Sequence, residues 1–162
     1  MSKKANLDKT NAMRIVDAAG LPHALHTYDA EQAVSGVEVA NFLGQDPDRV
    51  FKTLVTVGKS GEHYVFMIPV AYELDLKKAA TAAHEKSIAM IKSRELLGLT
   101  GYIHGGCSPI GMKKQFKTFI DETCVLYDQI LFSGGRRGTQ IEMSFDDLCQ
   151  VVDIEAIDLI AM

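Results

Sequence analysis

Two glycine-rich stretches in the second half of the chain constrain its structure more than any other feature. They read Gly101-Tyr-Ile-His-Gly-Gly-Cys-Ser-Pro-Ile-Gly111 and Ser133-Gly-Gly-Arg-Arg-Gly138. Glycine in regular structure costs roughly 0.5–1 kcal/mol relative to alanine, because it loses the most backbone freedom on folding. Two such clusters therefore predict loops in which the backbone turns sharply or approaches a ligand closely.

Both loops have the composition of an anion-binding site. Backbone N–H groups exposed in a glycine-rich loop can bind an anion or a developing oxyanion. The flanking cations favour a phosphate-bearing substrate, and they are Lys113, Lys114, Arg136 and Arg137. Two tight structural turns with solvated charges explain either loop equally well when it is taken alone.

The length of 162 residues is that of one ordinary domain, so we expect a single domain over residues 1–162. An apolar fraction of 47% excludes disorder. No apolar run approaches the roughly 18 residues of a membrane span, and no apolar stretch follows the basic start that would indicate a secretory signal. The sequence predicts a cytoplasmic protein without a membrane partner.

The cysteines and histidines do not form a metal-binding pattern. Cys107, Cys124 and Cys149 are widely spaced and form no CxxC pair, and the five histidines are scattered. This spacing fits neither a disulfide framework nor a zinc site, so we expect reduced thiols, no metal and no cofactor.

The charge is unevenly distributed along the chain. The net charge is −4, but residues 138–162 hold six acidic residues and no Lys or Arg. The remainder of the chain therefore has a slight excess of basic residues, and a basic face around the glycine loops is compatible with the acidic whole.

The hydrophobic pattern predicts an α+β fold around a mixed, largely antiparallel sheet packed with several short helices. A capping box of Ser35 and Glu38 begins a helix that ends near Gly44, and Asp75 begins another. Further helical segments are expected at 9–19, 46–47, 93–97 (ended by Gly98) and 144–152. Strands are expected at 24–28, 50–57, 63–70, 87–91, 100–104, 116–120, 129–133, 139–143 and 157–160.

Lys52 is the most unusual side chain in these strands, because it lies within the otherwise apolar run at 50–57. Period-two alternation places Lys52 and Leu54 on one face and Thr53 on the other. A solvated edge lysine is the more common case. A partly buried lysine, however, needs an anionic partner, and a ligand phosphate would serve.

Several other side chains could bind a ligand or carry chemistry. Tyr28 could offer its hydroxyl, His104 could act as a base beside Gly105 and Gly106, and Cys107 could be a thiol nucleophile. Packed or solvated structural roles remain open for all three. The rigid pair Ser108-Pro109 could aim the preceding N–H groups, and Ser133 before the hairpin loop at 134–138 could donate to a ligand.

The combined motifs resemble the bacterial Cys-tRNA(Pro) deacylase family (YbaK/EbsC), a branch of the prolyl-tRNA-editing superfamily. The resemblance rests on the two glycine-rich stretches, with Lys113-Lys114 after the first, and it runs from about His26 to the last helix. It also rests on His26-Thr-Tyr28, Asp46-Pro-Asp-Arg-Val-Phe-Lys-Thr53, Val50-Phe-Lys-Thr-Leu54 and Leu74-Asp-Leu-Lys-Lys78.

The resemblance implies an aminoacyl-tRNA editing domain that removes cysteine from mischarged Cys-tRNA(Pro) in trans. Its partners would be tRNA and a prolyl-tRNA synthetase. Cysteine and proline are close in volume, so binding alone cannot fully reject cysteine. The family further implies that the thiol of the substrate attacks the ester, so that the protein only orients it and stabilises an oxyanion.

By resemblance, the catalytic residues would be Lys52, which holds the 3′-terminal adenosine phosphate region, and Gly105 and Gly106, which present backbone to the ester. The expected substrate-binding residues are Tyr28, Thr53, Ser108, Ser133, Gly134, Gly135 and Arg137.

The chain departs from the family pattern at several positions that bear on the amino acid removed. Ser35 stands where the family usually has a bulky aromatic residue, and Gln140 where it commonly has an acid. His104 and Cys107 fall where apolar residues are frequent. Two alternative functions therefore stay open: a non-catalytic module that binds nucleotide or RNA 3′ ends, and a thiol enzyme based on Cys107.

Overall fold

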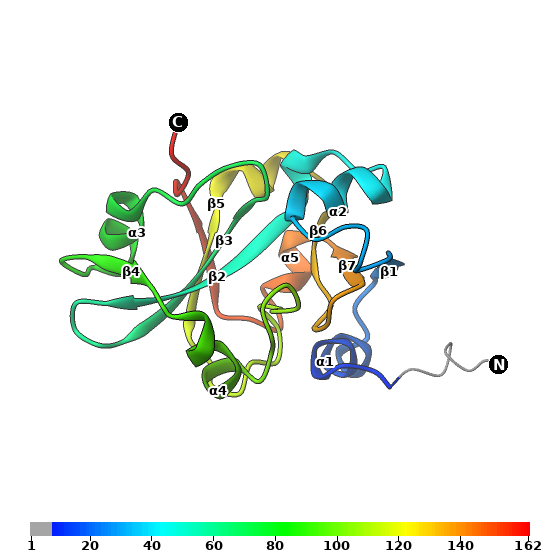
Figure 1. Cartoon of the computed structure of the whole chain (residues 1–162), viewed down its shortest axis with the longest axis horizontal. Helices are drawn as coiled ribbons and strands as arrows, with labels where there is room; N and C mark the ends of the chain where they lie inside the picture. Colours follow the sequence, from blue (N-terminus) through cyan, green and yellow to red (C-terminus); the bar gives the residue numbers. More distant parts are fainter. Residues whose placement is uncertain (1–7) are drawn as a thin grey trace.

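The computed structural model describes residues 8–162 (Figure 1), and the basic start at 1–6 lies outside this range. The strands form two sheets, one with the order β4-β2-β3-β5-β8 and one with the order β1-β7-β6. The β3–β5 and β5–β8 pairs are parallel, whereas every other pair is antiparallel. The predicted α+β class with mixed, largely antiparallel pairing is confirmed, although the strands divide between two sheets.

The five-stranded sheet is built on a long hairpin. Its first two strands are β2 (Phe51–Gly58) and β3 (His63–Pro69), which pair from Phe51↔Pro69 to Val57↔His63. β-branched and aromatic residues dominate both strands, as expected for a half-buried pleated surface. The other members are β4 (Ile88–Met90), β5 (Lys117–Asp121) and β8 (Ile154–Ile157).

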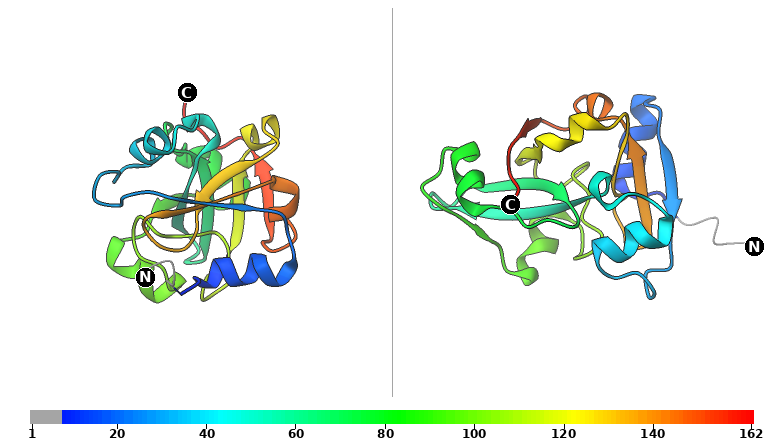
Figure 2. Two further views of the ribbon diagram at one scale, coloured as in Figure 1. Left: turned by 90° about the vertical axis from the view of Figure 1, so that its right-hand side faces the viewer. Right: turned by 90° about the horizontal axis from the view of Figure 1, so that it is seen from above.

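The three-stranded sheet stands at the end of the longer sheet opposite to β4 (Figure 2). It consists of β1 (Ala24–Thr27), β6 (Ile130–Ser133) and β7 (Thr139–Met143). A single parallel bridge between Val50 and Leu131 connects it to the start of β2. The second glycine-rich stretch is the β6–β7 hairpin loop, as predicted.

The helices begin at the residues that the sequence indicates. Ser35 and Glu38 form the expected capping box of α2, and the side chain of Asp75 accepts N–H groups of α3. The helices are α1 (Asn11–Ala19), α2 (Gly36–Leu43), α3 (Leu76–Ala83), α4 (Leu96–Thr100) and α5 (Phe145–Leu148), with 3₁₀ turns η2 (Pro47–Arg49), η3 (Ser93–Glu95) and η4 (Glu122–Leu126). Within residues 8–162, no helix is both long and apolar enough to span a bilayer.

The two faces of the long sheet pack against different parts of the chain. Phe66, Ile68 and Phe119 face the alanines of α3. On the other face, Val55 and Val65 pack against the segment from α4 to Met112. The largest cluster joins α1, α5 and the short sheet to the long one, and it includes Phe51, Met67, Ile120, Phe132 and Ile141.

Three predictions of secondary structure were wrong. No strand forms at 100–104, because η3 and α4 continue to Thr100 through Gly98 and end at Gly101, whose φ of 84° only glycine adopts readily. The edge strand expected at 157–160 begins three residues earlier, as β8 (Ile154–Ile157), and pairs with β5. The last helix spans only Phe145–Leu148.

A partly buried ion-pair network connects the short sheet to the start of β2. His26 Nε2 lies 2.6 Å from Glu142 Oε1, and the Arg49 guanidinium donates to the other oxygen of the same carboxylate. Partial burial raises the pKa of Glu142, but the hydrogen bonds from His26 and Arg49 outweigh that effect and hold the pKa below its ordinary value of 4.5. The charged carboxylate therefore stabilises the folded state.

We predict that Glu142→Gln lowers the free energy of unfolding by about 1–2 kcal/mol at pH 7, because one charge of the network is lost. The folded pKa is depressed, so this contribution is present above about pH 4.5 and disappears as the pH falls through the folded pKa. Urea unfolding of both proteins at pH 7 and pH 3.5 measures it. Glu155→Gln is the matched control, because Glu155 is exposed and makes only a loose pair with Lys117. A loss of stability that is equal at both pH values would contradict the linkage.

Candidate functional site

One edge of β2 is left open between the two sheets. On that edge β4 pairs only with Thr56–Gly58, and β6 reaches only Val50. The Val70 N–H donates to the Val50 carbonyl and the Gly58 N–H to the Glu62 carbonyl, so the even-numbered residues of β2 bond to β3. By the alternation of an antiparallel ladder, the backbone N–H and C=O of Thr53 point to the open edge.

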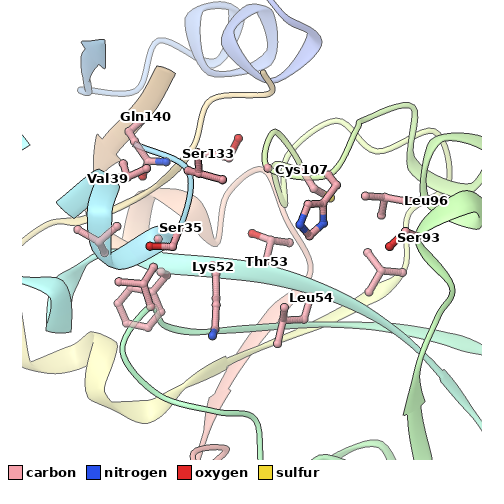
Figure 3. Close-up of a pocket in the computed structure, with 18 of the residues that line it drawn as sticks. Ser35, Val39, Lys52, Thr53, Leu54, Ser93, Leu96, Cys107, Ser133 and Gln140 are labelled. Carbon is pink, nitrogen blue, oxygen red and sulfur yellow. The ribbon is translucent and has the colours of Figure 1, made fainter. Parts of the chain in front are cut away.

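A cavity of about 460 Å³ lies along this open edge (Figure 3). Its walls come from the start of α2, both faces of β2, the segment around η3 and α4, the first glycine-rich stretch and the ends of β6 and β7. The residues that the argument below uses are Tyr28, Ser35, Gly36, Lys52, Thr53, Leu54, Met90, Leu96, His104, Gly105, Cys107, Ser133 and Gln140.

Lys52 supplies the cation of the cavity. Its strand partner is Ile68, which belongs to the face that packs on α3, and Figure 3 shows Lys52 and Leu54 on the side of β2 opposite to Thr53. Lys52 is half-buried and makes no ion pair with any of the residues 8–162. A half-buried ammonium without an acid partner favours an anionic ligand.

The first residues of α2 border the same cavity. At Gly36, α2 approaches the end of β3 so closely that a Cβ would be 2.4 Å from Val70 Cγ1. Only glycine allows this approach. The free N–H groups of a helix N-terminus carry partial positive charge, although Glu38 of the capping box offsets part of it. An anion that contacts Lys52 would therefore meet a second favourable field.

Polar groups without partners line the Thr53 side of the cavity. Thr53 Oγ1 and Gln140 Oε1 are buried and make no hydrogen bond within residues 8–162. Gln140 is only 7% exposed and is the strand partner of Ser133, which also lines the cavity. Buried polar groups normally have partners, so these two atoms are the ones that a bound ligand would satisfy.

Hydrogen bonds hold the first glycine-rich stretch in a fixed shape. The Tyr102 hydroxyl donates to the Ile110 carbonyl at 2.6 Å, and the Gly106 N–H donates to the Ile103 carbonyl at 2.9 Å. Ser108 is fully buried and its hydroxyl accepts the Ile110 N–H. His104, Gly105 and Cys107 reach the cavity wall from this stretch.

The second stretch packs directly on the first. A Cβ at Gly106 would lie 2.9 Å from Arg136 Cα and 3.0 Å from Arg137 N, so the two backbones touch there. Arg137 Nε donates to the His104 carbonyl at 3.0 Å. In the second stretch, Gly134 packs closely against Thr139 and Gly135 against Thr10, whereas Gly138 has a φ of 93°.

The structure brings together about half of the predicted site residues. Lys52, Thr53, Tyr28, Gly105 and Ser133 all line the cavity. Five others lie behind its wall and hold the two loops in place, and these are Gly106, Ser108, Gly134, Gly135 and Arg137.

Two parts of the cavity were not selected from the sequence. From the sequence, Gln140 was named only as a departure from the family pattern. Its place on the same face of an alternating strand as Glu142 was the signal that could have marked it as a site residue. Leu54, Met90 and Leu96 form an apolar wall of the cavity. Nothing in the sequence around them indicates this role, because they belong to ordinary amphipathic segments.

Cys107 is unsuited to act as the nucleophile. The side chain is 7% exposed, and burial raises the pKa of its thiol to about 12. The thiolate is the reactive form, so this thiol stays protonated and unreactive near neutral pH. Within residues 8–162, no group of three side chains is arranged to hold a metal ion.

A family model described as the aminoacyl-tRNA editing domain matches residues 30–151. A protein of Enterococcus faecalis with the provisional name Cys-tRNA(Pro)/Cys-tRNA(Cys) deacylase EbsC is 46% identical over 145 residues, which cover 89% of this chain and 88% of that protein. A proline–tRNA ligase of Pelobacter propionicus is 34% identical over 77 residues, which cover 48% of this chain and 13% of that enzyme.

Solved structures share the fold at low identity. The crystal structure of a provisionally assigned trans-editing enzyme for prolyl-tRNA synthetase has a TM-score of 0.83 and 22% identity, and covers 96% of this chain and 100% of its own. The structure of the hypothetical protein APE2540 has a TM-score of 0.84 and 22% identity, and covers 93% and 99% of the two chains.

The contact between the two glycine-rich loops predicts that Gly106→Ala is destabilising by about 1–3 kcal/mol, because the new methyl group would meet backbone atoms that cannot move independently. Gly98→Ala is the matched control: it lies in α4 with nothing within 4 Å of its Cβ, so it should leave stability unchanged or raise it by up to about 1 kcal/mol. Thermal and urea unfolding measure both variants. Equal stability of the two variants would contradict the described packing.

Proposed function

The chain belongs to the aminoacyl-tRNA editing domain family, and we propose that it is a trans-acting deacylase that removes cysteine from Cys-tRNA(Pro), with residues 1–162 acting as a single editing domain. One observation carries the proposal: on one side of β2 a small cavity has a lysine without an ion pair among residues 8–162, and on the other side it has polar atoms without a hydrogen bond in that range. An aminoacyl ester joined to a phosphate-bearing nucleotide needs both kinds of contact.

We assign the cationic side of the cavity to the 3′-terminal nucleotide. Lys52 and the N-terminus of α2 offer positive charge to phosphate or sugar oxygens. The aminoacyl group then lies on the Thr53 side, near Gln140 and Ser133, where buried acceptors would bind its ammonium group. The cavity would hold the ester bond close to the open edge of β2.

The protein need not supply a nucleophile for cysteine. In the proposed route the substrate sulfur attacks the ester carbonyl carbon, and the terminal ribose oxygen leaves and takes up a proton. The products are tRNA with a free terminal hydroxyl and a cyclic thioester, which water opens to cysteine. A free thiol is a few per cent thiolate near pH 7 and strongly nucleophilic, whereas the Cys107 thiol is kept protonated.

The oxyanion of this step requires donors that are free. The Gly106 N–H already donates to the Ile103 carbonyl, so it is occupied. We assign the donors to the N–H groups of Gly105 and Cys107, because both residues line the cavity and neither N–H has an acceptor within residues 8–162. Gly106 then contributes by letting the second loop pack behind them. One such donor is worth roughly 100–1000-fold in rate.

The relation to proline–tRNA ligase supports a prolyl-tRNA synthetase as the second partner. Such a synthetase cannot reject cysteine completely on size, because one small difference in side-chain volume gives only about 10–200-fold discrimination. A free-standing deacylase would remove the mischarged product after release.

We predict that Lys52→Ala slows deacylation of Cys-tRNA(Pro) more than about 100-fold, because it removes the charge that holds the nucleotide in position. Single-turnover release of labelled cysteine measures the rate, and circular dichroism checks the fold. The control is Lys59→Ala in the exposed turn after β2, which should stay within about twofold of wild type. A folded Lys52→Ala with the wild-type rate would contradict the assignment. A wild-type protein that binds tRNA but releases no cysteine would instead be a non-catalytic 3′-end binding module.

A second prediction concerns the nucleophile. Blocking the substrate thiol as S-methyl-cysteinyl-tRNA(Pro) should slow deacylation at least about 100-fold, and Ser-tRNA and Ala-tRNA should react at similarly low rates. Rapid quenching and mass spectrometry should detect the cyclic thioester early in the reaction of Cys-tRNA. Equal rates for the methylated and free thiol would show that activated water attacks instead.

A further inference from the structure

Six cations lie in three segments that adjoin residues lining the cavity or pack on their neighbours. They come from η3 and its N-cap, from the segment after the first glycine-rich stretch and from the second stretch, and they are Lys92, Arg94, Lys113, Lys114, Arg136 and Arg137. We call these six residues the cationic rim. All except the half-buried Arg136 are exposed, and none makes an ion pair with any of the residues 8–162.

The three segments of the cationic rim are joined by direct contacts. The Lys113 N–H donates to the Thr100 carbonyl at the end of α4, and η3 leads directly into α4. The glycine loops touch at Gly106, and Arg137 bonds to the His104 carbonyl. Figure 1 shows α4, the segment after it and the β6–β7 loop along one side of the molecule, below β2.

The rim begins at the cavity itself. Ser93, between Lys92 and Arg94, lines the cavity, and so does Gly105, which packs against Arg137. A ligand that extends out of the cavity in this direction therefore meets the rim cations next.

No rim cation pairs with a carboxylate of residues 8–162, whereas some cations elsewhere in that range do. Lys9, Arg49, Lys78 and Lys117 all pair with carboxylates. The acid within the rim segments is Glu95, whose carboxylate accepts the Lys92 N–H, and Arg136 donates to the backbone carbonyl of Asp8. The rim thus keeps most of its positive charge, in a protein whose net charge is −4.

We propose that the cationic rim binds the backbone phosphates of the tRNA acceptor end that leads away from the cavity. This proposal rests on the proposed function, because the terminal nucleotide must occupy the cavity. Neutralising phosphates releases condensed counterions, which makes such contacts favourable and salt-dependent. An acidic protein of net charge −4 can attract a polyanion only through a local patch of this kind.

Exposed apolar side chains lie among these cations, as expected for contact with unpaired nucleotides. Leu97 is 56% exposed on α4, and Ile103 is 50% exposed two residues before Gly105. Grooves that bind single-stranded nucleic acid combine cations that contact the phosphate backbone with side chains against which the bases pack. This combination favours a nucleic-acid strand over an acidic protein as the occupant.

The test compares two substrates and two double variants. Lys113→Gln/Lys114→Gln removes two exposed rim charges, and Lys77→Gln/Lys86→Gln removes two exposed charges at α3 and the turn after it. Each is assayed on Cys-tRNA(Pro) and on cysteinyl-adenosine, which carries the same ester but no phosphate. The dependence of KM on salt concentration is recorded for both.

We expect the rim variant to raise the KM for Cys-tRNA(Pro) about tenfold at low salt with kcat nearly unchanged. The slope of log(1/KM) against log salt should become shallower by about 2, and the kinetics on cysteinyl-adenosine should not change. The α3 variant should match wild type on both substrates.

Other outcomes overturn the proposal in distinct ways. An unchanged KM and salt slope would show that the rim does not contact tRNA, and an equal loss on both substrates would show that the variant disturbs the cavity. The same shallower slope in the α3 variant would indicate only a general effect of net charge. A rim variant that loses affinity for prolyl-tRNA synthetase while keeping its tRNA kinetics would assign the rim to a protein. If wild type cleaves neither substrate, it is the proposed function that fails.

Discussion

The open edge of β2 is the constraint on which the rest of the site depends. A strand paired on both edges would have its backbone groups satisfied, and a neighbouring strand would fill the space beside Thr53 that the cavity occupies. Here β4 is too short and β6 bridges only at Val50, so the edge between them stays free. Successive residues of β2 then face one cavity from two sides, so a single ligand can reach a cation and a hydroxyl that has no hydrogen bond in the described part of the chain.

The two glycine-rich loops act as a unit behind this edge. Gly106 is required less for contact with a ligand than for contact between the loops, because the two backbones meet there, and the Arg137 side chain also joins the loops. Tyr102 and Ser108 fix the first loop from inside. A loop held in this way can present N–H groups in a set geometry before a substrate arrives, which is the condition for effective oxyanion stabilisation.

In the proposed mechanism the substrate supplies the reactive thiol, and the protein supplies positive charge. Burial keeps the Cys107 thiol neutral, so the only thiol poised to react in the proposed mechanism is that of the substrate. Acids gather toward the end of the chain, where several of them pair with cations such as Lys78 and Lys117. The cations around the cavity mouth are left without such partners in the described chain, so the molecule can be acidic as a whole and still offer phosphates a positive surface.

The sequence alone determined what depends on neighbours along the chain. Caps at Ser35 and Asp75, the β2–β3 hairpin, the α+β class and Lys52 as an unusual strand cation all follow from local pattern, and the order of motifs identified the family. The prediction of a strand failed at 100–104, where the sequence Thr100-Gly-Tyr-Ile-His104 did not reveal that the preceding helix continues to Thr100. Only the tertiary structure decided that β2 has a free edge, that Gln140 lies buried beside it, and that Gly106 serves packing. These features depend on pairings between residues far apart in the sequence, and no local pattern encodes which strand edge stays uncovered.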